Sequence, residues 1–230
     1  MDHAAWTIFW TRRIADAAAS QQPAVVVLDL DDPALRPLLD LAPTQADLAR
    51  VTAYGEAARD YFFKRHSLLR HLIALRLGCA AEDVVVSHDK AGAPQLLAPA
   101  RQEALYLSLS GRGSFAALAL ASRPIGVDLE ILSPLADVPE AMLHPNEQAR
   151  LADLDAANRH KAFLEIWTLK EAYLKALRIG LSREPAEIDV AFEGAAIGLF
   201  DRGERVNRRA CASRFELFTA ATVIAACVIL

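Results

Sequence analysis

The sequence predicts a globular protein of mixed α and β structure around a sizeable hydrophobic core. Of its 230 residues, 53% are hydrophobic and 23% are charged, which is the balance of a folded protein. Segments with the apolar spacing of helices and short apolar runs typical of strands both occur. A chain of this length is long enough for one large domain or two small ones.

The segment 163–177 has a clear helical pattern, because it lacks proline and glycine and its apolar residues share one face. Lys170 projects from the middle of that face, Glu171 lies at its edge, and Lys175 follows one turn later. A buried ammonium is costly unless it meets an anion. We therefore expect the face either to pack against a negative group or to line a site that holds one. The alternative is a surface helix with a Glu171–Lys175 pair and a Lys170 that reaches water along its aliphatic stem.

Residues 125–131 have the alternation of a short strand. Asp128 and Glu130 point to the same face, where two carboxylates repel each other unless a cation lies between them. Oxygen ligands of this kind suit Mg²⁺, and Glu171 is the candidate for a third carboxylate. The alternative is the solvated polar face of an edge strand.

These two segments together resemble the signature of the 4′-phosphopantetheinyl transferases. The matching residues are Ile-Gly-Val-Asp-Leu-Glu at 125–130 and Trp-Thr-Leu-Lys-Glu-Ala-Tyr-Leu-Lys at 167–175. The chain looks like the larger, surfactin-synthetase-activating type. That resemblance implies an α+β fold of two similar halves related by a pseudo-twofold axis, with the active site in the cleft between them. We expect residues 1–123 to form the coenzyme A-binding half and residues 124–230 the half with the metal and the catalytic helix.

The resemblance implies an enzyme that transfers the 4′-phosphopantetheine arm of coenzyme A to a serine of an acyl or peptidyl carrier protein. Adenosine 3′,5′-bisphosphate is the expected leaving product, and coenzyme A is the co-substrate. Asp128, Glu130 and Glu171 are expected to hold Mg²⁺ against the pyrophosphate, where the metal neutralises charge that builds on transfer.

Three further residues receive catalytic roles from the resemblance. Lys170 is expected to contact or orient a phosphate, and Lys175 to steady the leaving phosphate. Glu147, or a water that it orients, would deprotonate the serine. The alternative for Glu147 is pairing with a helix N-terminal dipole. His144 is a second candidate base by residue type alone.

The coenzyme A contacts are expected in the first half. The helix predicted over 56–77 has a basic face, which the resemblance places near the 3′-phosphate, although a solvated face is the alternative. The turn at 89–94 resembles one that approaches the nucleotide, and the segment 105–112 resembles a strand of the same site. The positions assigned to coenzyme A are Arg65, Arg70, Gly92, Pro94, Ser108, Ser110, Lys170 and Lys175.

Three positions depart from the pattern of the family. Leu109 replaces a histidine, Ala93 replaces a lysine for which Lys90 is a nearby substitute, and Arg178 replaces a glycine. Each lost charge-assisted contact would weaken coenzyme A binding by about 1.5–3 kcal/mol. These departures keep two alternatives open: a degenerate relative that binds a nucleotide or carrier protein without catalysis, and a Mg²⁺-dependent phosphohydrolase that needs no acceptor protein.

Composition and net charge argue against several other classes of protein. The net charge of −4 does not favour nucleic-acid binding, and no apolar run approaches the length of about 20 residues that crosses a membrane. Three cysteines without a Cys-x-x-Cys pair, and an N-terminus without a signal-peptide pattern, lead us to expect a cytoplasmic protein. The family resemblance implies a monomer. Residues 131–142 are the expected carrier-docking loop, from position alone.

Other elements are expected from periodicity and turn residues. A helix near 44–53 would begin at the N-cap Thr44, another lies around 148–154, and Gly180 would end the signature helix. Residues 202–209 read as a surface loop. Strands are expected at 25–31, 115–122, 188–192, 215–218 and 222–228.

Overall fold

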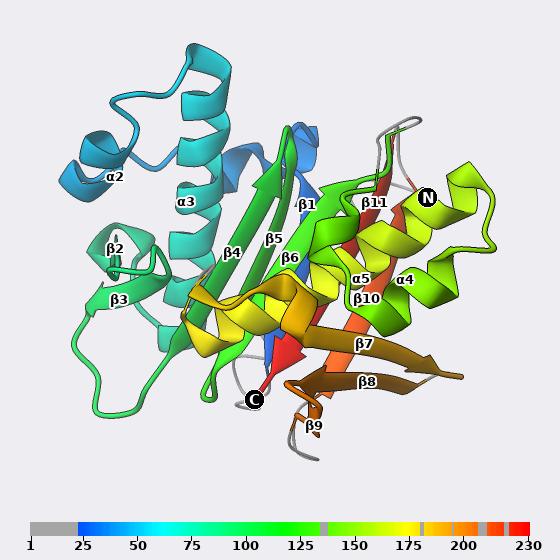
Figure 1. Cartoon of the computed structure of the whole chain (residues 1–230). Helices are drawn as coiled ribbons and strands as arrows, with labels where there is room; N and C mark the ends of the chain where they lie inside the picture. The colour runs from blue at the N-terminus through cyan, green and yellow to red at the C-terminus, as the bar shows by residue number, and fades with distance from the viewer. Residues whose placement is uncertain (1–22, 134–137, 180–181, 195, 207–210, 219–220) are drawn as a thin grey trace. The chain divides into compact units, whose positions relative to one another are not determined.

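The computed structural model describes residues 23–133, 138–179, 182–194, 196–206, 211–218 and 221–230. The chain divides into two compact units, Met1–Arg123 and Pro124–Leu230, and each is described by itself (Figure 1). Both units combine helices with antiparallel strands, so the mixed α and β structure predicted from the sequence is confirmed. The pseudo-twofold relation and the cleft stay predictions.

The first unit packs one long helix against a three-stranded antiparallel sheet of order β1-β5-β4. The central strand β5 is buried at all seven positions, which fits its run of alanine and leucine. A separate hairpin pairs β2 with β3. The elements in chain order are β1 (Ala24–Asp29), η1 (Pro33–Leu38), α2 (Gln45–Arg50), α3 (Glu56–Leu77), η2 (Ala81–Asp83), β2 (Val85–His88), β3 (Pro94–Ala98), β4 (Tyr106–Arg112) and β5 (Phe115–Ala121).

The helix ends in this unit follow from local chemistry. α3 has the predicted bounds, and Gly78 ends it in the left-handed conformation that glycine adopts without steric cost. Thr44 is the N-cap of α2, as predicted, and forms a capping box with Asp47. The helix ends at Arg50 rather than near residue 53.

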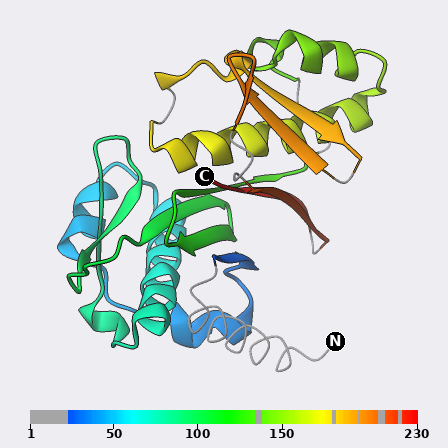
Figure 2. The ribbon, with the colours of Figure 1, turned by 90° about the horizontal axis from the view of Figure 1, so that it is seen from below.

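The second unit places α5 between two sheets (Figures 1 and 2). One sheet has the order β10-β11-β6, and the other has the order β7-β8-β9. The side of α5 that faces β6 and β11 forms its largest interface. The elements are β6 (Ile125–Ile131), η3 (Glu140–Met142), α4 (Pro145–Leu151), α5 (Ala156–Leu177), η5 (Pro185–Glu187), β7 (Ile188–Glu193), β8 (Ala196–Asp201), β9 (Glu204–Arg205), β10 (Cys211–Phe218) and β11 (Thr222–Ile229).

α5 begins earlier than predicted, whereas its last residue agrees with the helical pattern of 163–177. The helix begins at Ala156 behind the N-cap Asp155, seven residues earlier than the apolar pattern indicates. It ends at Leu177, where Arg178 takes the left-handed C-cap position with φ 58°. The predicted stop, Gly180, lies outside the described residues. None of the helices in the described part of the chain combines the length and apolar content needed to cross a bilayer.

Two neighbouring histidines in the first unit, the buried His66 and the half-buried His88, bear on its stability in acid. The ring of His66 stacks on Phe62, donates through Nδ1 to Asp47 Oδ1 at 2.7 Å, and lies 5.3 Å from the ring of His88. Burial, followed by the positive charges of Arg50 and His66, lowers the pKa of His88 from 6.5 to about 4.

We expect acid to weaken the first unit through His88. Its folded pKa is depressed, so its contribution to stability is complete above the ordinary value of 6.5 and declines as the pH falls towards about 4. The decline is at most about 3 kcal/mol. The variant His88→Gln should lose stability less steeply over this range in urea unfolding at a series of pH values. Parallel pH curves for the two proteins would contradict the assignment.

Candidate active site

The site is built where α5 touches β6 backbone to backbone. A Cβ atom on Gly126 would lie 1.8 Å from the carbonyl oxygen of Ala172 and 2.5 Å from the amide nitrogen of Ala176. Only glycine at this position lets the helix approach so closely. Because strand side chains alternate, Asp128 and Glu130 point to the same side of β6 as this contact.

The three acidic residues predicted as metal ligands lie near one another at this contact. Asp128 is buried, and its Oδ1 atom lies 2.6 Å from the Nζ atom of Lys175. Burial, and next the charge of Asp128, raise the pKa of Glu171; Lys175 opposes this rise and Glu130 adds to it. The structure therefore gathers three carboxylates and one ammonium along the α5–β6 contact.

The chemistry of this donor set fits Mg²⁺, which prefers carboxylate oxygens. As the side chains stand, the described residues contain no group of three ready to coordinate an ion. The ammonium of Lys175 supplies the positive charge beside Asp128 instead. A metal ion at Asp128 would compete with this ammonium for the same carboxylate.

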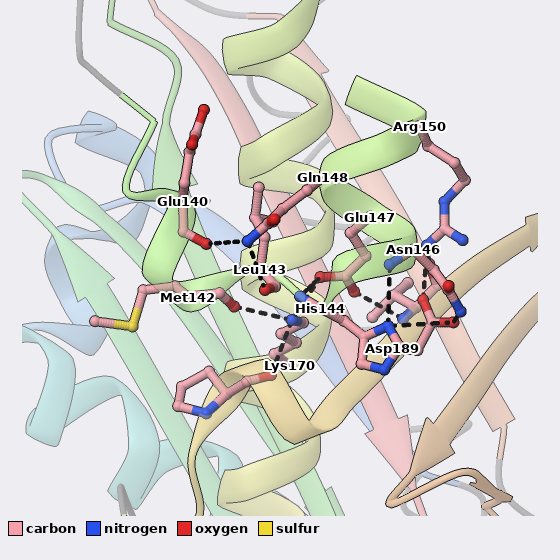
Figure 3. Close-up of polar contacts among 12 residues, drawn as sticks. Glu140, Met142, Leu143, His144, Asn146, Glu147, Gln148, Arg150, Lys170 and Asp189 are labelled. Carbon is pink, nitrogen blue, oxygen red and sulfur yellow. Dashed lines mark hydrogen bonds and ion pairs between the residues drawn. The ribbon is translucent and has the colours of Figure 1, made fainter. Parts of the chain in front are cut away.

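Lys170 lies in the interior, away from solvent (Figure 3). Its Nζ atom is 2.6 Å from Glu147 Oε2 and donates to the carbonyl oxygens of Met142 and Pro185 at 3.0 and 2.9 Å. These three acceptors occupy all three N–H groups of the ammonium. In this structure the anion that Lys170 meets is a carboxylate of the protein, and its contact with a phosphate stays a prediction.

Glu147 has no exposed surface either. Its Oε1 atom accepts from the amide of Val190 at 2.8 Å, and its Oε2 atom accepts from the amide of His144 at 2.8 Å as part of the capping box of α4. In this arrangement the carboxylate has the helix-terminal role that the sequence left open, and it is closed off from a second protein. Its role as base stays a prediction.

His144 is also a poor candidate base in this arrangement. Its Nδ1 atom accepts a hydrogen bond from the amide of Asn146 at 3.2 Å, which caps α4. A neutral imidazole that accepts through Nδ1 carries its proton on Nε2 and has no second lone pair to offer.

Sequence reasoning missed a second group of polar contacts, which joins α4 to β7 (Figure 3). Asp189 accepts from Asn146 Nδ2 and from Arg150 Nη2, both at 2.7 Å. Burial alone would raise the pKa of Asp189, but the hydrogen bonds from Arg150 and Asn146 outweigh it and lower the pKa. In the sequence, the one indication of this group was Asp189, a charged residue within an apolar strand. Nothing near it in the sequence indicated that its partners lie about forty residues upstream.

The two arginines predicted to contact coenzyme A have different positions in the first unit. Arg70 is buried and donates to the carbonyl oxygens of Val84 and Ala42 at 3.0 and 2.8 Å, which is a structural role in this unit; its contact with a phosphate stays a prediction. Arg65 lies across the β4–β5 turn: a Cβ on Gly111 would be 2.0 Å from its Nη1 atom. Burial lowers the pKa of Arg65.

The other predicted coenzyme A positions lie at two turns and a strand of this unit. Gly92 has φ +84°, and the guanidinium that approaches it belongs to Arg50, 3.6 Å from an added Cβ. Pro94 begins β3, Ser108 is buried in β4, and Ser110 is half-buried near the end of that strand.

Alanine at position 126 is expected to lower the free energy of unfolding by about 1–3 kcal/mol, because its methyl group would force α5 away from β6. The displacement would also separate Glu171 from Asp128 and reduce activity. Urea unfolding measures the first effect. Gly55→Ala is the control, since nothing lies within 4 Å of a Cβ there, and its effect should be smaller. Equal losses for the two variants would contradict the close contact.

Comparisons with known proteins point to one family. The model of the 4′-phosphopantetheinyl transferase superfamily matches residues 124–227. The chain is 32% identical to the 4′-phosphopantetheinyl transferase HetI of Nostoc sp. over 171 residues, which is 71% of each protein. It is 28% identical to the slr0495 protein of Synechocystis sp. over 70% of this chain and 67% of that protein. It is 26% identical to the 4′-phosphopantetheinyl transferase psf-1 of Bacillus pumilus over 50% of this chain and 48% of that protein.

Proposed function

The chain belongs to the 4′-phosphopantetheinyl transferase superfamily, and from this membership we propose that it transfers the phosphopantetheine arm of coenzyme A to carrier proteins. One observation supports the assignment of the site most strongly. Asp128, Glu130, Glu171 and Lys175 converge at the α5–β6 contact, and all four lie inside the region matched by the family model.

In the proposed reaction the hydroxyl of a carrier serine attacks the phosphorus atom that bears the pantetheine arm. A phosphorus–oxygen bond to the serine forms, the bond to the second phosphate breaks, and adenosine 3′,5′-bisphosphate leaves. Asp128, Glu130 and Glu171 would hold Mg²⁺, which when bound supplies positive charge against the pyrophosphate. The ammonium of Lys175 is partly exposed and can pass from Asp128 to a phosphate oxygen.

In this proposal a water molecule from the solvent takes the serine proton, because Glu147 and Lys170 are enclosed and bonded to each other. We assign the coenzyme A contacts of the first unit to Arg65, Gly92, Pro94, Ser108 and Ser110, without Arg70.

Three finer features belong to the same proposal. We assign the chain to the surfactin-synthetase-activating type, because a second compact unit precedes the matched region. A monomer and a cytoplasmic location follow from that type. Leu109 and Ala93 are expected to weaken coenzyme A binding without affecting the chemistry of the α5–β6 contact.

The test is a transfer assay with the purified full chain, Mg²⁺, coenzyme A and an apo carrier protein. The carrier should gain the mass of one phosphopantetheine arm, and a carrier with its acceptor serine changed to alanine should gain nothing. Cleavage of coenzyme A without any carrier would indicate a phosphohydrolase instead. An unmodified carrier together with intact coenzyme A would contradict the transferase.

A further inference from the structure

On the basis of the transferase function above, we propose that Glu147 and Lys170 are positioning residues: their buried ion pair fixes the rotation of α5, so that Glu171 faces Asp128 and Glu130. Neither residue touches the substrate. They act through the helix that carries the third carboxylate.

Helix geometry links the directions of Lys170 and Glu171. Consecutive residues on a helix are separated by about 100°, so the direction of Lys170 determines the direction of its neighbour Glu171. With Lys170 held on the side of η3 and η5, Glu171 turns towards β6. Lys175, one turn later, points the same way and reaches Asp128.

Contacts on two sides of α5 hold the helix in this rotation. On the β6 side, Gly126 contacts the backbone of Ala172 and Ala176. These small residues determine how closely α5 approaches β6, but they do not by themselves fix the rotation of the helix. On the other side Lys170 makes three directional contacts, with Glu147, the carbonyl of Met142 and that of Pro185, each from a different element. Together with the Lys175–Asp128 ion pair on the β6 side, these three contacts restrict rotation of the helix.

Glu147 is itself anchored to β7. The polar side chains of α4 and its N-cap converge on two neighbouring residues of β7. Glu147 accepts from the Val190 amide, and Asp189 accepts from Asn146 and Arg150. Lys170 thus binds to a carboxylate that is fixed to a strand rather than to a mobile side chain (Figure 3).

The charges of Glu147 and Lys170 have a role beyond stability. A buried ion pair generally gives a protein no more stability than a well-packed apolar pair would, so stability alone does not account for it. Orientation does, because Glu171 faces two carboxylates that repel it and would turn away if α5 could rotate.

Direct binding of Mn²⁺, followed by electron paramagnetic resonance without coenzyme A or carrier, tests this inference. The variant Lys170→Met keeps all three carboxylates, yet its affinity for Mn²⁺ should fall by about 10–100-fold, as expected for loss of a group that orients metal ligands. Lys161→Met removes another lysine of α5 and should leave the affinity unchanged.

Asp189→Asn provides a second variant if Lys170→Met does not fold, because it loosens α4 from β7 and leaves the ion pair in place. Its affinity for Mn²⁺ should fall in the same direction by a smaller factor. Unchanged Mn²⁺ affinity in both variants would overturn the inference, as would a wild-type chain that binds no Mn²⁺. Failure of the transferase function itself would be seen in a different measurement, as an unchanged mass of the carrier protein in the assay with the wild-type chain.

Discussion

Replacing Lys170 with methionine is expected to lower the free energy of unfolding by about 3–5 kcal/mol. Methionine matches the length of lysine but leaves Glu147 as an uncompensated charge with no access to water. The carbonyl oxygens of Met142 and Pro185 would also lose their donor. Urea unfolding at neutral pH, followed by circular dichroism, measures the difference from the wild-type protein.

A double-mutant cycle provides the control. In Glu147→Gln the ammonium of Lys170 is left without its charge partner, so this single variant should also be strongly destabilised. The combined variant removes both charges, and the introduced glutamine can still accept from one of the amides of His144 and Val190. It should therefore lose much less than the sum of the two single losses. Additive losses would show that the two side chains do not depend on each other.

The origin of the anion beside Lys170 could not be predicted from the sequence. Helical spacing correctly placed an ammonium on a buried face, and the cost of burying it correctly required a negative partner. Whether that partner is a ligand phosphate or a protein carboxylate depends on a contact with Glu147, 23 residues earlier. Periodicity within one helix contains no information about such a contact.

The two arginines of α3 show what helix geometry adds to a prediction made from residue type. Arg65 and Arg70 are five residues apart, which separates their directions by about 140°. Two side chains so far apart on one helix do not reach the same phosphate. Arg70 lies on the side of the buried Leu69 and Ile73, and its guanidinium donates to backbone carbonyls there.

The strand 125–131 and its acidic face were predictable because both depend on local order along the chain. Alternation places Asp128 and Glu130 together, and Gly126 admits the helix that brings Glu171 to them. The hairpin of β8 and β9 was not predicted, since its residues carry little alternation, and a surface loop was expected over 202–209. Of that range, residues 207–210 lie outside the described part of the chain.

Glu171→Gln is expected to reduce transfer to the carrier protein by about 100-fold or more. The substitution removes the negative charge with which Glu171 would bind the Mg²⁺ ion beside the pyrophosphate. The metal-free variant should be no less stable than the wild type. Ionised Glu171 is half-buried beside Asp128 and Glu130, and burial and these charges raise its pKa, so the fold disfavours its charged form. Glutamine keeps the shape and removes the repulsion.

Thermal unfolding with and without Mg²⁺ separates this effect from a structural one. The ion binds the folded wild-type protein and should raise its melting temperature, and this rise should be small in Glu171→Gln. Glu165→Gln, on another side of α5, is the control and should behave like the wild type. Loss of stability in the metal-free variant, or undiminished transfer, would contradict the assignment. Loss of activity without loss of stability would mark Glu171 as a residue of the site, whereas Lys170→Met should lose stability because that lysine also holds the fold together.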